Sequence, residues 1–201
     1  MSTDRVVIVG ASHAGAQLAA NLRKEKWAGD ILLIGDEGRL PYQRPPLSKA
    51  YLAGDCHLDD VAIRSRQFYD KQRIELVDGT VTSIDRAERT VTLGNNDAVS
   101  YSKLALCTGA RARALPVPGA DLPGVHYLRT ATDVEAIRAA AVPGSRVVIV
   151  GGGYIGLETA ASLRTLGVEV TVLEAAGRVL ERVTAPVVSE FFDRIHREKG
   201  V

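Results

Sequence analysis

Six residues in the second half of the chain have the spacing of a phosphate-binding turn. Residues 151–156 read Gly-Gly-Gly-Tyr-Ile-Gly and match the pattern Gly-x-Gly-x-x-Gly. In this pattern the first glycine permits a tight turn, the second lets the backbone approach a pyrophosphate, and the third lets a helix pack close to a strand. The N-terminus of that helix offers N–H groups and about half a positive charge to the phosphates. The pattern alone is weak evidence, so its flanking residues decide the interpretation.

The residues on both sides of this turn favour a dinucleotide site. Residues 147–150 are all Val or Ile, which is typical of a buried parallel strand. Residues 154–166 predict a helix rich in small residues, and residues 168–173 predict the next strand. That strand is followed by Glu174, which lies 23 residues after Gly151 (174 − 151), near the spacing of an acid that binds a ribose.

Glu174 indicates which nucleotide the turn would bind. A carboxylate accepts hydrogen bonds from a ribose 2′-hydroxyl and repels a 2′-phosphate, so this acid favours NADH over NADPH. Arg178 and Arg182 follow it and could reach a phosphate, which weakens the preference. The alternative that Glu174 is a plain acid at a strand end stays open.

A second copy of this unit lies near the start of the chain. The hexapeptide Arg-Val-Val-Ile-Val-Gly of residues 5–10 recurs 141 residues later (151 − 10). It leads into the turn Gly-Ala-Ser-His-Ala-Gly, in which Ser12 replaces the middle glycine. The Ser12 side chain crowds a pyrophosphate, although its hydroxyl could donate to one. A helix over 13–25 and a strand over 31–34 follow, and Asp36 is the matching acid.

Two such turns in one chain predict two cofactors. Hydride chemistry needs a donor ring and an acceptor ring, and NADH with a flavin is the simplest pair. Each strand–helix–strand copy implies a right-handed parallel crossover, so the fold class is α/β with two Rossmann-like dinucleotide-binding domains. The alternative, that one or both turns are only tight strand-to-helix connections, is less favoured but open.

Shorter elements separate and follow the two copies. Pro46 predicts the start of a short helix over 47–52, and Thr132-Asp133 predicts a cap for a helix over 134–141. Other predicted elements are a helix over 66–72 and strands over 74–77, 81–84, 90–93, 98–101 and 104–107. Residues 114–124 are rich in Pro and Gly, which predicts a first domain over 1–113 and a second over 114–201. A helix over 185–199 ends the chain without a further strand, so we expect the second domain to be incomplete.

Composition limits the alternatives. Of 201 residues 46% are hydrophobic and 24% are charged, a globular composition that excludes disorder. The net charge of +1 gives no overall electric field that would attract nucleic acid or an anionic membrane surface. No apolar run approaches the 18 to 20 residues of a membrane span. Cys56 and Cys107 have no CxxC spacing, so neither a zinc site nor a disulfide framework is expected, and a reducing cytoplasm suits them.

Several longer stretches are similar to one family of flavoproteins. They are PYQRPPLSKAYL (41–52), LALCTGARARALPVPG (104–119), HYLRT (126–130), GGGYIGLE (151–158) and RVLERVTAPVVSEFF (178–192). On these residues the chain resembles the FAD-dependent ferredoxin reductases of the putidaredoxin reductase type, within the pyridine nucleotide-disulfide oxidoreductase superfamily. The family is about twice as long, so the resemblance implies that this chain is the N-terminal half.

The resemblance implies a set of site residues. Those expected to bind FAD are Gly10, Ser12, Ala14, Gly15, Asp36, Arg44, Lys49, Val81, Thr108, Gly109 and Arg129. Those expected to bind NADH are Gly151, Gly153, Tyr154, Ile155, Gly156, Glu174 and Arg182. Lys49 and Glu158 match catalytic positions, and we predict an ion pair between them. The alternatives without a catalytic role are that Lys49 is an exposed helix lysine and that Glu158 is a solvated helix acid.

The resemblance also implies a reaction and its partners. Electrons from NADH would pass through FAD to a [2Fe-2S] ferredoxin that serves a haem-thiolate monooxygenase or a ring-hydroxylating dioxygenase. Relatives that reduce disulfides carry a redox cysteine near residues 40–50, and this sequence has none there, so a thiol relay is not expected. Other readings are a reductase of rubredoxin or another acceptor, a flavoprotein similar to apoptosis-inducing factor, and an inactive truncated fragment.

Overall fold

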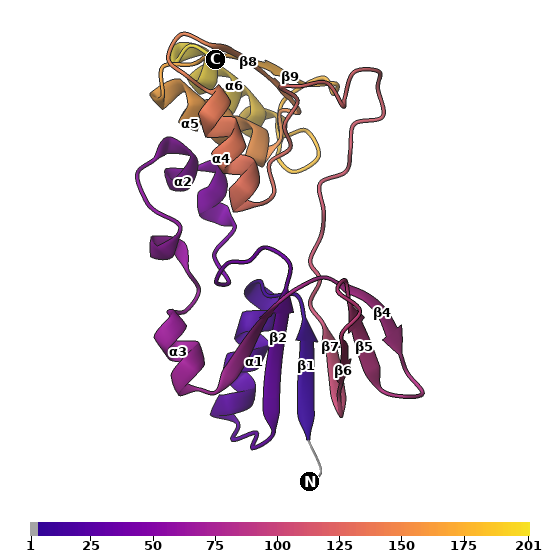
Figure 1. Cartoon of the computed structure of the whole chain (residues 1–201). Helices are drawn as coiled ribbons and strands as arrows, with labels where there is room; N and C mark the ends of the chain where they lie inside the picture. Colours follow the sequence, from indigo (N-terminus) through magenta and orange to yellow (C-terminus); the bar gives the residue numbers. More distant parts are fainter. Residues whose placement is uncertain (1–3) are drawn as a thin grey trace. The chain divides into compact units, whose positions relative to one another are not determined.

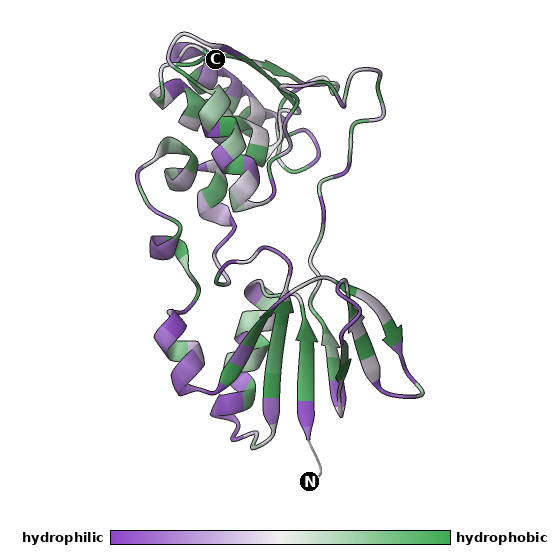
Figure 2. Ribbon diagram, viewed as in Figure 1, coloured by the Kyte–Doolittle hydropathy of each residue, from purple (hydrophilic) through white to green (hydrophobic). Residues whose placement is uncertain are grey.

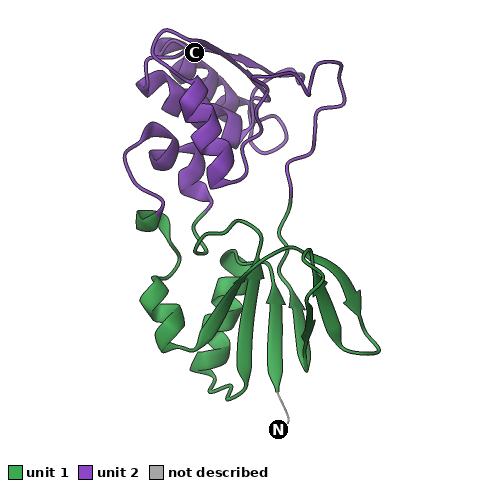
Figure 3. Cartoon of the chain, viewed as in Figure 1, with its two compact units in different colours: residues 1–43, 59–110 green, residues 44–58, 111–201 purple. Residues whose placement is uncertain are grey.

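The computed structural model describes residues 4–201, and the chain divides into two compact units (Figure 3). The first unit comprises the chain up to residue 43 together with residues 59–110. The second comprises residues 44–58 and 111–201. The segment 44–58 therefore packs with residues 111–201, although it lies in the sequence between two parts of the first unit.

The first unit is built on a parallel sheet (Figure 1). Its strands are β1 (Arg5–Val9), β2 (Asp30–Gly35), β3 (Ile74–Asp78) and β7 (Lys103–Leu106), in the order β3-β2-β1-β7. Helix α1 (His13–Lys24) connects β1 to β2, and the short helices η2 (Asp59–Val61) and α3 (Arg66–Lys71) precede β3. This arrangement confirms the strand–helix–strand unit predicted from the first glycine turn.

Both faces of this sheet are covered, which explains why its strands are apolar at successive positions. Val6 and Ile8 pack with Ala16 and Ala19 of α1 on one face. Val7 and the neighbouring β2 residues pack on the other face against β4 (Val81–Asp85), β5 (Thr90–Leu93) and β6 (Ala98–Ser100). These three strands form an antiparallel sheet, so the unit has three layers. Figure 2 shows the hydrophobic length of β1 and β2.

The second unit repeats the strand–helix–strand pattern. Strand β8 (Arg146–Val150), helix α5 (Tyr154–Thr165) and strand β9 (Glu169–Leu173) follow one another, and the two strands pair in parallel. The other helices of the unit are η1 (Pro45–Ser48), α2 (Ala50–Ala53), α4 (Ala131–Ala140) and α6 (Pro186–Glu198). Helix α5 packs on β8 and β9 and also contacts η1 and α2. None of the helices within residues 4–201 is both long and apolar enough to span a membrane.

Two expectations about helices in this unit were wrong. The helix predicted over 47–52 is two short helices, because Lys49 has φ −125° and ψ −115° and interrupts the helical backbone between η1 and α2. The cap predicted at Thr132-Asp133 lies at Thr130 instead. The Thr130 hydroxyl accepts from the Asp133 N–H and the Asp133 carboxylate accepts from the Thr130 N–H, which is a capping box with Asp133 three residues into the helix.

Candidate functional site

The first glycine turn follows β1 and opens α1. Gly10 has φ +114°, and a Cβ built on it would lie 2.0 Å from the Cys107 carbonyl oxygen. A Cβ on Gly15 would lie 2.0 Å from the Gly10 carbonyl oxygen and 2.9 Å from Leu33. Both positions therefore require glycine, for the turn and for the close packing of α1 against the sheet.

Ser12 occupies the N-cap position of α1 with an extended backbone, φ −130° and ψ −162°, which any L-residue can adopt. Its side chain makes no capping hydrogen bond. The first N–H groups of an α-helix have no partner within the helix, so α1 presents donors suited to phosphate oxygens at this end.

The other residues predicted for FAD in this unit lie at the same edge of the sheet. Asp36 is exposed directly after β2. The Gly79 N–H donates to the Gly35 carbonyl at 2.8 Å, which fixes the connection to Val81 beside the end of β2. Thr108 and Gly109 follow β7 and are exposed. This is the carboxyl edge of a parallel sheet, where open α/β folds bind their ligands.

The glycines of the second turn have different roles. Gly151 has φ +115°, and a Cβ on Gly156 would lie 2.0 Å from the Gly151 carbonyl oxygen, so these two residues shape the turn. A Cβ on Gly153 would meet nothing within 4 Å, and Gly153 is exposed. Tyr154 and Ile155, the first residues of α5, are also exposed. The backbone at Gly153 is therefore open to approach, as a bound pyrophosphate requires.

Glu174 is tied to this turn. Its Oε2 accepts from the Gly152 N–H at 2.7 Å, and its Oε1 accepts from the Ala176 N–H at 2.8 Å. These bonds hold the pKa of the Glu174 carboxyl below its ordinary value, and the bond from Ala176 has the largest effect. The positive charge of Arg182 lowers the pKa further. The Leu180 N–H donates to the Gly152 carbonyl at 2.9 Å, so the loop after β9 also packs against the turn.

The predicted ion pair between Lys49 and Glu158 is confirmed. The Lys49 Nζ lies 2.7 Å from Glu158 Oε2, and the Lys49 side chain is half exposed. The Ser48 hydroxyl donates to the same carboxylate oxygen at 2.6 Å. Sequence reasoning missed Ser48, although it directly precedes Lys49. It also missed Ser162, whose position four residues after Glu158 places both on one face of α5.

Arg44 and Arg129 are also brought together in the second unit. The Arg44 Nη1 donates to the Arg129 carbonyl at 2.9 Å. The Arg129 N–H donates to Asp133 Oδ2 at 3.0 Å, so the N-terminus of α4 fixes the Arg129 backbone.

The predicted FAD residues are divided between the two units. Those of the first unit are Gly10, Ser12, Ala14, Gly15, Asp36, Val81, Thr108 and Gly109. Those of the second unit are Arg44, Lys49 and Arg129, and all residues predicted for NADH lie in the second unit as well. The roles of these residues remain predictions.

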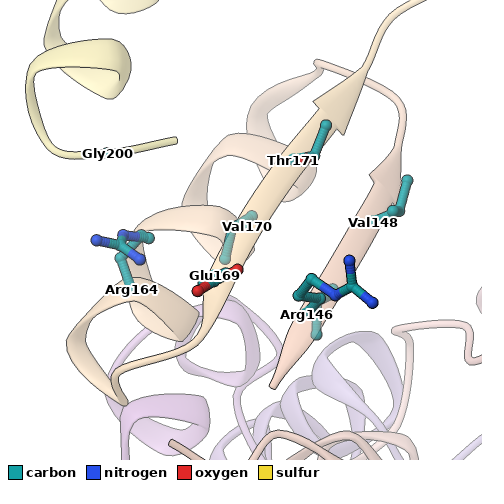
Figure 4. Close-up of a pocket in the computed structure, with 8 residues that line it drawn as sticks. Arg146, Val148, Arg164, Glu169, Val170, Thr171 and Gly200 are labelled. Carbon is teal, nitrogen blue, oxygen red and sulfur yellow. The ribbon is translucent and has the colours of Figure 1, made fainter. Parts of the chain in front are cut away.

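A pocket of about 820 Å³ opens in the second unit at the starts of β8 and β9 (Figure 4). The glycine turn lies at the other end of these strands, so this pocket is separate from it. Its lining includes Val148 and Thr171 on the exposed face of the two strands, together with Arg164 of α5 and Gly200. On that exposed face of β8, the exposed fractions of Val148 and Val150 are 59% and 64%. In the repeated hexapeptide these residues match Val7 and Val9, and β4–β6 cover that face in the first unit. This face of β8 is therefore exposed in the second unit, whereas the matching face of β1 is buried in the first.

Comparison with known proteins defines the class. The family model for pyridine nucleotide-disulphide oxidoreductases matches residues 4–201, so the chain belongs to that family. It is 47% identical over its whole length to a probable ferredoxin reductase of Castellaniella defragrans, 49% of which it covers. It is 46% identical over its whole length to the putidaredoxin reductase of Pseudomonas putida, 48% of which it covers.

A solved structure gives the same result. The ferredoxin reductase for the CYP199A2 system of Rhodopseudomonas palustris superposes with a TM-score of 0.94 at 46% identity, covering 98% of this chain and 49% of that one. The resemblance to reductases of the putidaredoxin reductase type is thereby confirmed. The chain spans about half the length of the curated relatives it matches.

Proposed function

We propose that the protein acts as a flavin-dependent oxidoreductase that takes electrons from NADH and delivers them to a [2Fe-2S] ferredoxin. The observation that supports this most is the duplication. One chain contains two strand–turn–helix units, and in each unit the tight turn between strand and helix requires glycine. Bound FAD would supply the conversion between the two electrons of a hydride and the single electrons that an iron–sulfur acceptor takes. The reductase names of the relatives agree with this assignment.

The second turn is the proposed NADH site. Gly153 leaves room for a pyrophosphate, and the first N–H groups of α5 would donate to it. Glu174 would accept from the ribose 2′-hydroxyl. Its two oxygens already accept from Gly152 and Ala176, but each carboxylate oxygen can accept a second bond, so the acid is both fixed in place and available.

The first turn is the proposed pyrophosphate site for FAD, and the chain fits it through the same features. Gly10 and Gly15 bring α1 close to the sheet, and the Ser12 hydroxyl, which caps no backbone group, would donate to a phosphate. Asp36 would hold the adenosine ribose. Lys49 would contact the cofactor, and Glu158 would set the orientation of the Lys49 side chain. The ammonium would then be a positive charge held in a fixed place.

The acceptor is proposed as a ferredoxin, with a haem-thiolate monooxygenase or a ring-hydroxylating dioxygenase as its client. Dioxygenase systems are named for three of the relatives. A second candidate acceptor is rubredoxin, because an NADH:rubredoxin oxidoreductase shares the fold with a TM-score of 0.84 at 27% identity. A cytoplasmic location stays a prediction from the sequence.

The test starts with the purified chain and added FAD. We expect retained flavin absorbance after gel filtration, bleaching of that absorbance by NADH, and faster reoxidation by a [2Fe-2S] ferredoxin than by rubredoxin in stopped flow. Faster reoxidation by rubredoxin would replace the acceptor. A colourless chain with no affinity for NADH would favour the inactive fragment and reject the proposal for these residues.

A further inference from the structure

The ion pair of Lys49 and Glu158 is part of a larger hydrogen-bond network inside the second unit. Glu158 Oε2 accepts from Lys49 Nζ at 2.7 Å and from the Ser48 hydroxyl at 2.6 Å. The Ser162 hydroxyl donates to the Ser48 carbonyl at 2.8 Å. Lys49 Nζ also donates to the Pro45 carbonyl at 3.2 Å. Every member of this network belongs to η1, Lys49 or α5.

One helix holds Ser48 at two points. Glu158 and Ser162 are four residues apart on α5 and therefore lie on the same face, one turn apart. Glu158 binds the Ser48 side chain, and Ser162 binds the Ser48 main chain. The end of η1 can then neither rotate nor slide along α5 without breaking one of the two bonds.

Burial makes these two bonds strong constraints. Ser48 and Ser162 have exposed fractions of only 4% and 8%. A buried hydroxyl that loses its protein partner gains no water in exchange, so the full desolvation cost opposes any other arrangement. Both serines are thus held in the observed geometry.

The ion pair alone would be a weaker constraint. The Lys49 side chain is half exposed, and exposed ion pairs gain little because water and salt screen them and the long side chain loses freedom. Lys49 also lies at the break between η1 and α2, where its backbone has φ −125° and ψ −115° and is not helical. What fixes the ammonium is a carboxylate that is itself fixed, and Ser48 is the buried group that donates to that carboxylate.

We propose that Ser48 and Ser162 are positioning residues that hold the Lys49–Glu158 pair in its working geometry. Ser48 orients the Glu158 carboxylate directly, and Ser162 orients Ser48 through its carbonyl. The consequence for catalysis rests on the proposed function, whereas the positioning itself is a property of the folded chain and can be measured without cofactors.

The first experiment measures the reactivity of Lys49. The chain is treated with an N-hydroxysuccinimide ester at pH 8, and acylation of Lys49 is followed by mass spectrometry relative to Lys24 and Lys103. We expect Ser48→Ala to raise the relative rate about three- to tenfold, because a charge-assisted bond to Glu158 is lost from a partly exposed pair. Ser162→Ala should raise it by a smaller factor, Glu158→Gln should give the upper limit, and Ser48→Thr should restore a rate near that of the unchanged chain.

The matched control is Ser189→Ala. Ser189 is a buried serine of the same unit whose hydroxyl donates to the Val179 carbonyl, away from Glu158. Its loss should leave Lys49 acylation unchanged, even where it lowers the midpoint of thermal unfolding. Equal rates for Ser48→Ala, Ser162→Ala and the unchanged chain would overturn the proposal, and so would an unchanged rate for Glu158→Gln. If Ser48→Ala does not fold, Ser162→Ala decides.

The second experiment separates positioning from the proposed function. In the FAD-loaded protein, Ser48→Ala should slow flavin reduction at saturating NADH by about the factor measured for acylation, with an unchanged Kd for NADH. An altered Kd with an unchanged limiting rate would reject the positioning role. If the unchanged chain is not reduced by NADH at all, the proposed function fails, while the acylation series still tests whether the serines fix Lys49.

Discussion

The carboxylate of Glu174 accepts a hydrogen bond from the N–H of Gly152, at 2.7 Å, so the acid that follows β9 is fastened to the turn that follows β8. The two strands are parallel neighbours, and the Gly151 N–H also donates to the Leu173 carbonyl at 2.7 Å. A glycine turn and an acid at the next strand end therefore form one rigid unit. Its rigidity means that a ribose ligand would find the acid already in place.

Replacing Glu174 should weaken the distinction between NADH and NADPH. In Glu174→Ala the hydrogen bond to a ribose 2′-hydroxyl and the repulsion of a 2′-phosphate are both lost, and Arg182 remains nearby. We expect the ratio of the affinities for NADH and NADPH to fall about tenfold, the size of one charge-assisted hydrogen bond. The measurement is fluorescence titration with both nucleotides. Glu181→Ala, which removes an acid from the same loop, is the control, and an unaltered ratio in Glu174→Ala would contradict the ribose role.

The same carboxylate should make a pH-dependent contribution to stability. Its pKa in the folded chain lies below the ordinary value of 4.5, because the Ala176 and Gly152 N–H groups bind its charged form. The unfolded chain then binds the proton more readily, so the contribution is complete above about pH 5.5 and is lost as the pH falls through the folded pKa. Urea unfolding of the unchanged chain and of Glu174→Gln should differ at pH 7 and converge towards pH 3. A difference that stays constant over this range would show that the bonds do not favour the charged form.

Lys49→Met tests the charge that the Glu158 pair holds in place. Methionine keeps an unbranched side chain and removes the ammonium, so the fold and FAD binding should persist while flavin reduction by NADH slows about tenfold or more. Stopped-flow absorbance measures the rate, and the flavin-to-protein ratio checks retention. Lys24→Met, on the exposed end of α1, is the control. Unchanged reduction kinetics with full flavin content would remove Lys49 from the catalytic residues.

Sequence patterns predict the local parts of this molecule well. The four apolar residues 147–150 lie in β8, and a Cβ on Gly10, Gly15 or Gly156 would lie 2.0 Å from a backbone carbonyl oxygen. The Lys49–Glu158 pair also follows from the sequence, through the family resemblance.

The parts that sequence reasoning missed depend on packing between distant segments. Ser48 and Ser162 are 114 residues apart in the chain, and no local pattern joins them. Residues 44–58 pack with the second unit because η1 and α2 contact α5 and α4, which a composition change near residue 114 does not reveal. The cap of α4 was misplaced since Thr130 and Thr132 are both good caps, and the choice depends on which one Asp133 faces.

Arg23 should be the strongest polar contributor to the stability of the first unit. Its guanidinium donates to the carbonyls of Gln72, Trp27, Gly29 and Arg73 at 2.7 to 2.8 Å, which ties α1 to the segments before β2 and β3. Lysine has one nitrogen and cannot reach all four, so Arg23→Lys should lower the free energy of unfolding by about 1–3 kcal/mol. Urea denaturation measures the loss, with Lys24→Arg as the control. A change below about 0.5 kcal/mol would mean that water replaces these bonds at little cost.

The glycines of the second turn should separate binding from folding. Gly153→Ala places a methyl group where nothing lies within 4 Å, with a φ of −81° that alanine adopts, so unfolding should shift by less than about 1 kcal/mol. The methyl group would lie where the backbone must approach a pyrophosphate, so NADH affinity should fall at least tenfold. Gly156→Ala has the opposite profile, since its Cβ would lie 2.0 Å from the Gly151 carbonyl oxygen, and α5 must move away from β8. We expect a loss of more than about 2 kcal/mol of stability for that variant. Thermal unfolding and nucleotide titration of the two variants side by side provide the comparison, and NADH binding by Gly153→Ala with unchanged affinity would show that the phosphates bind elsewhere.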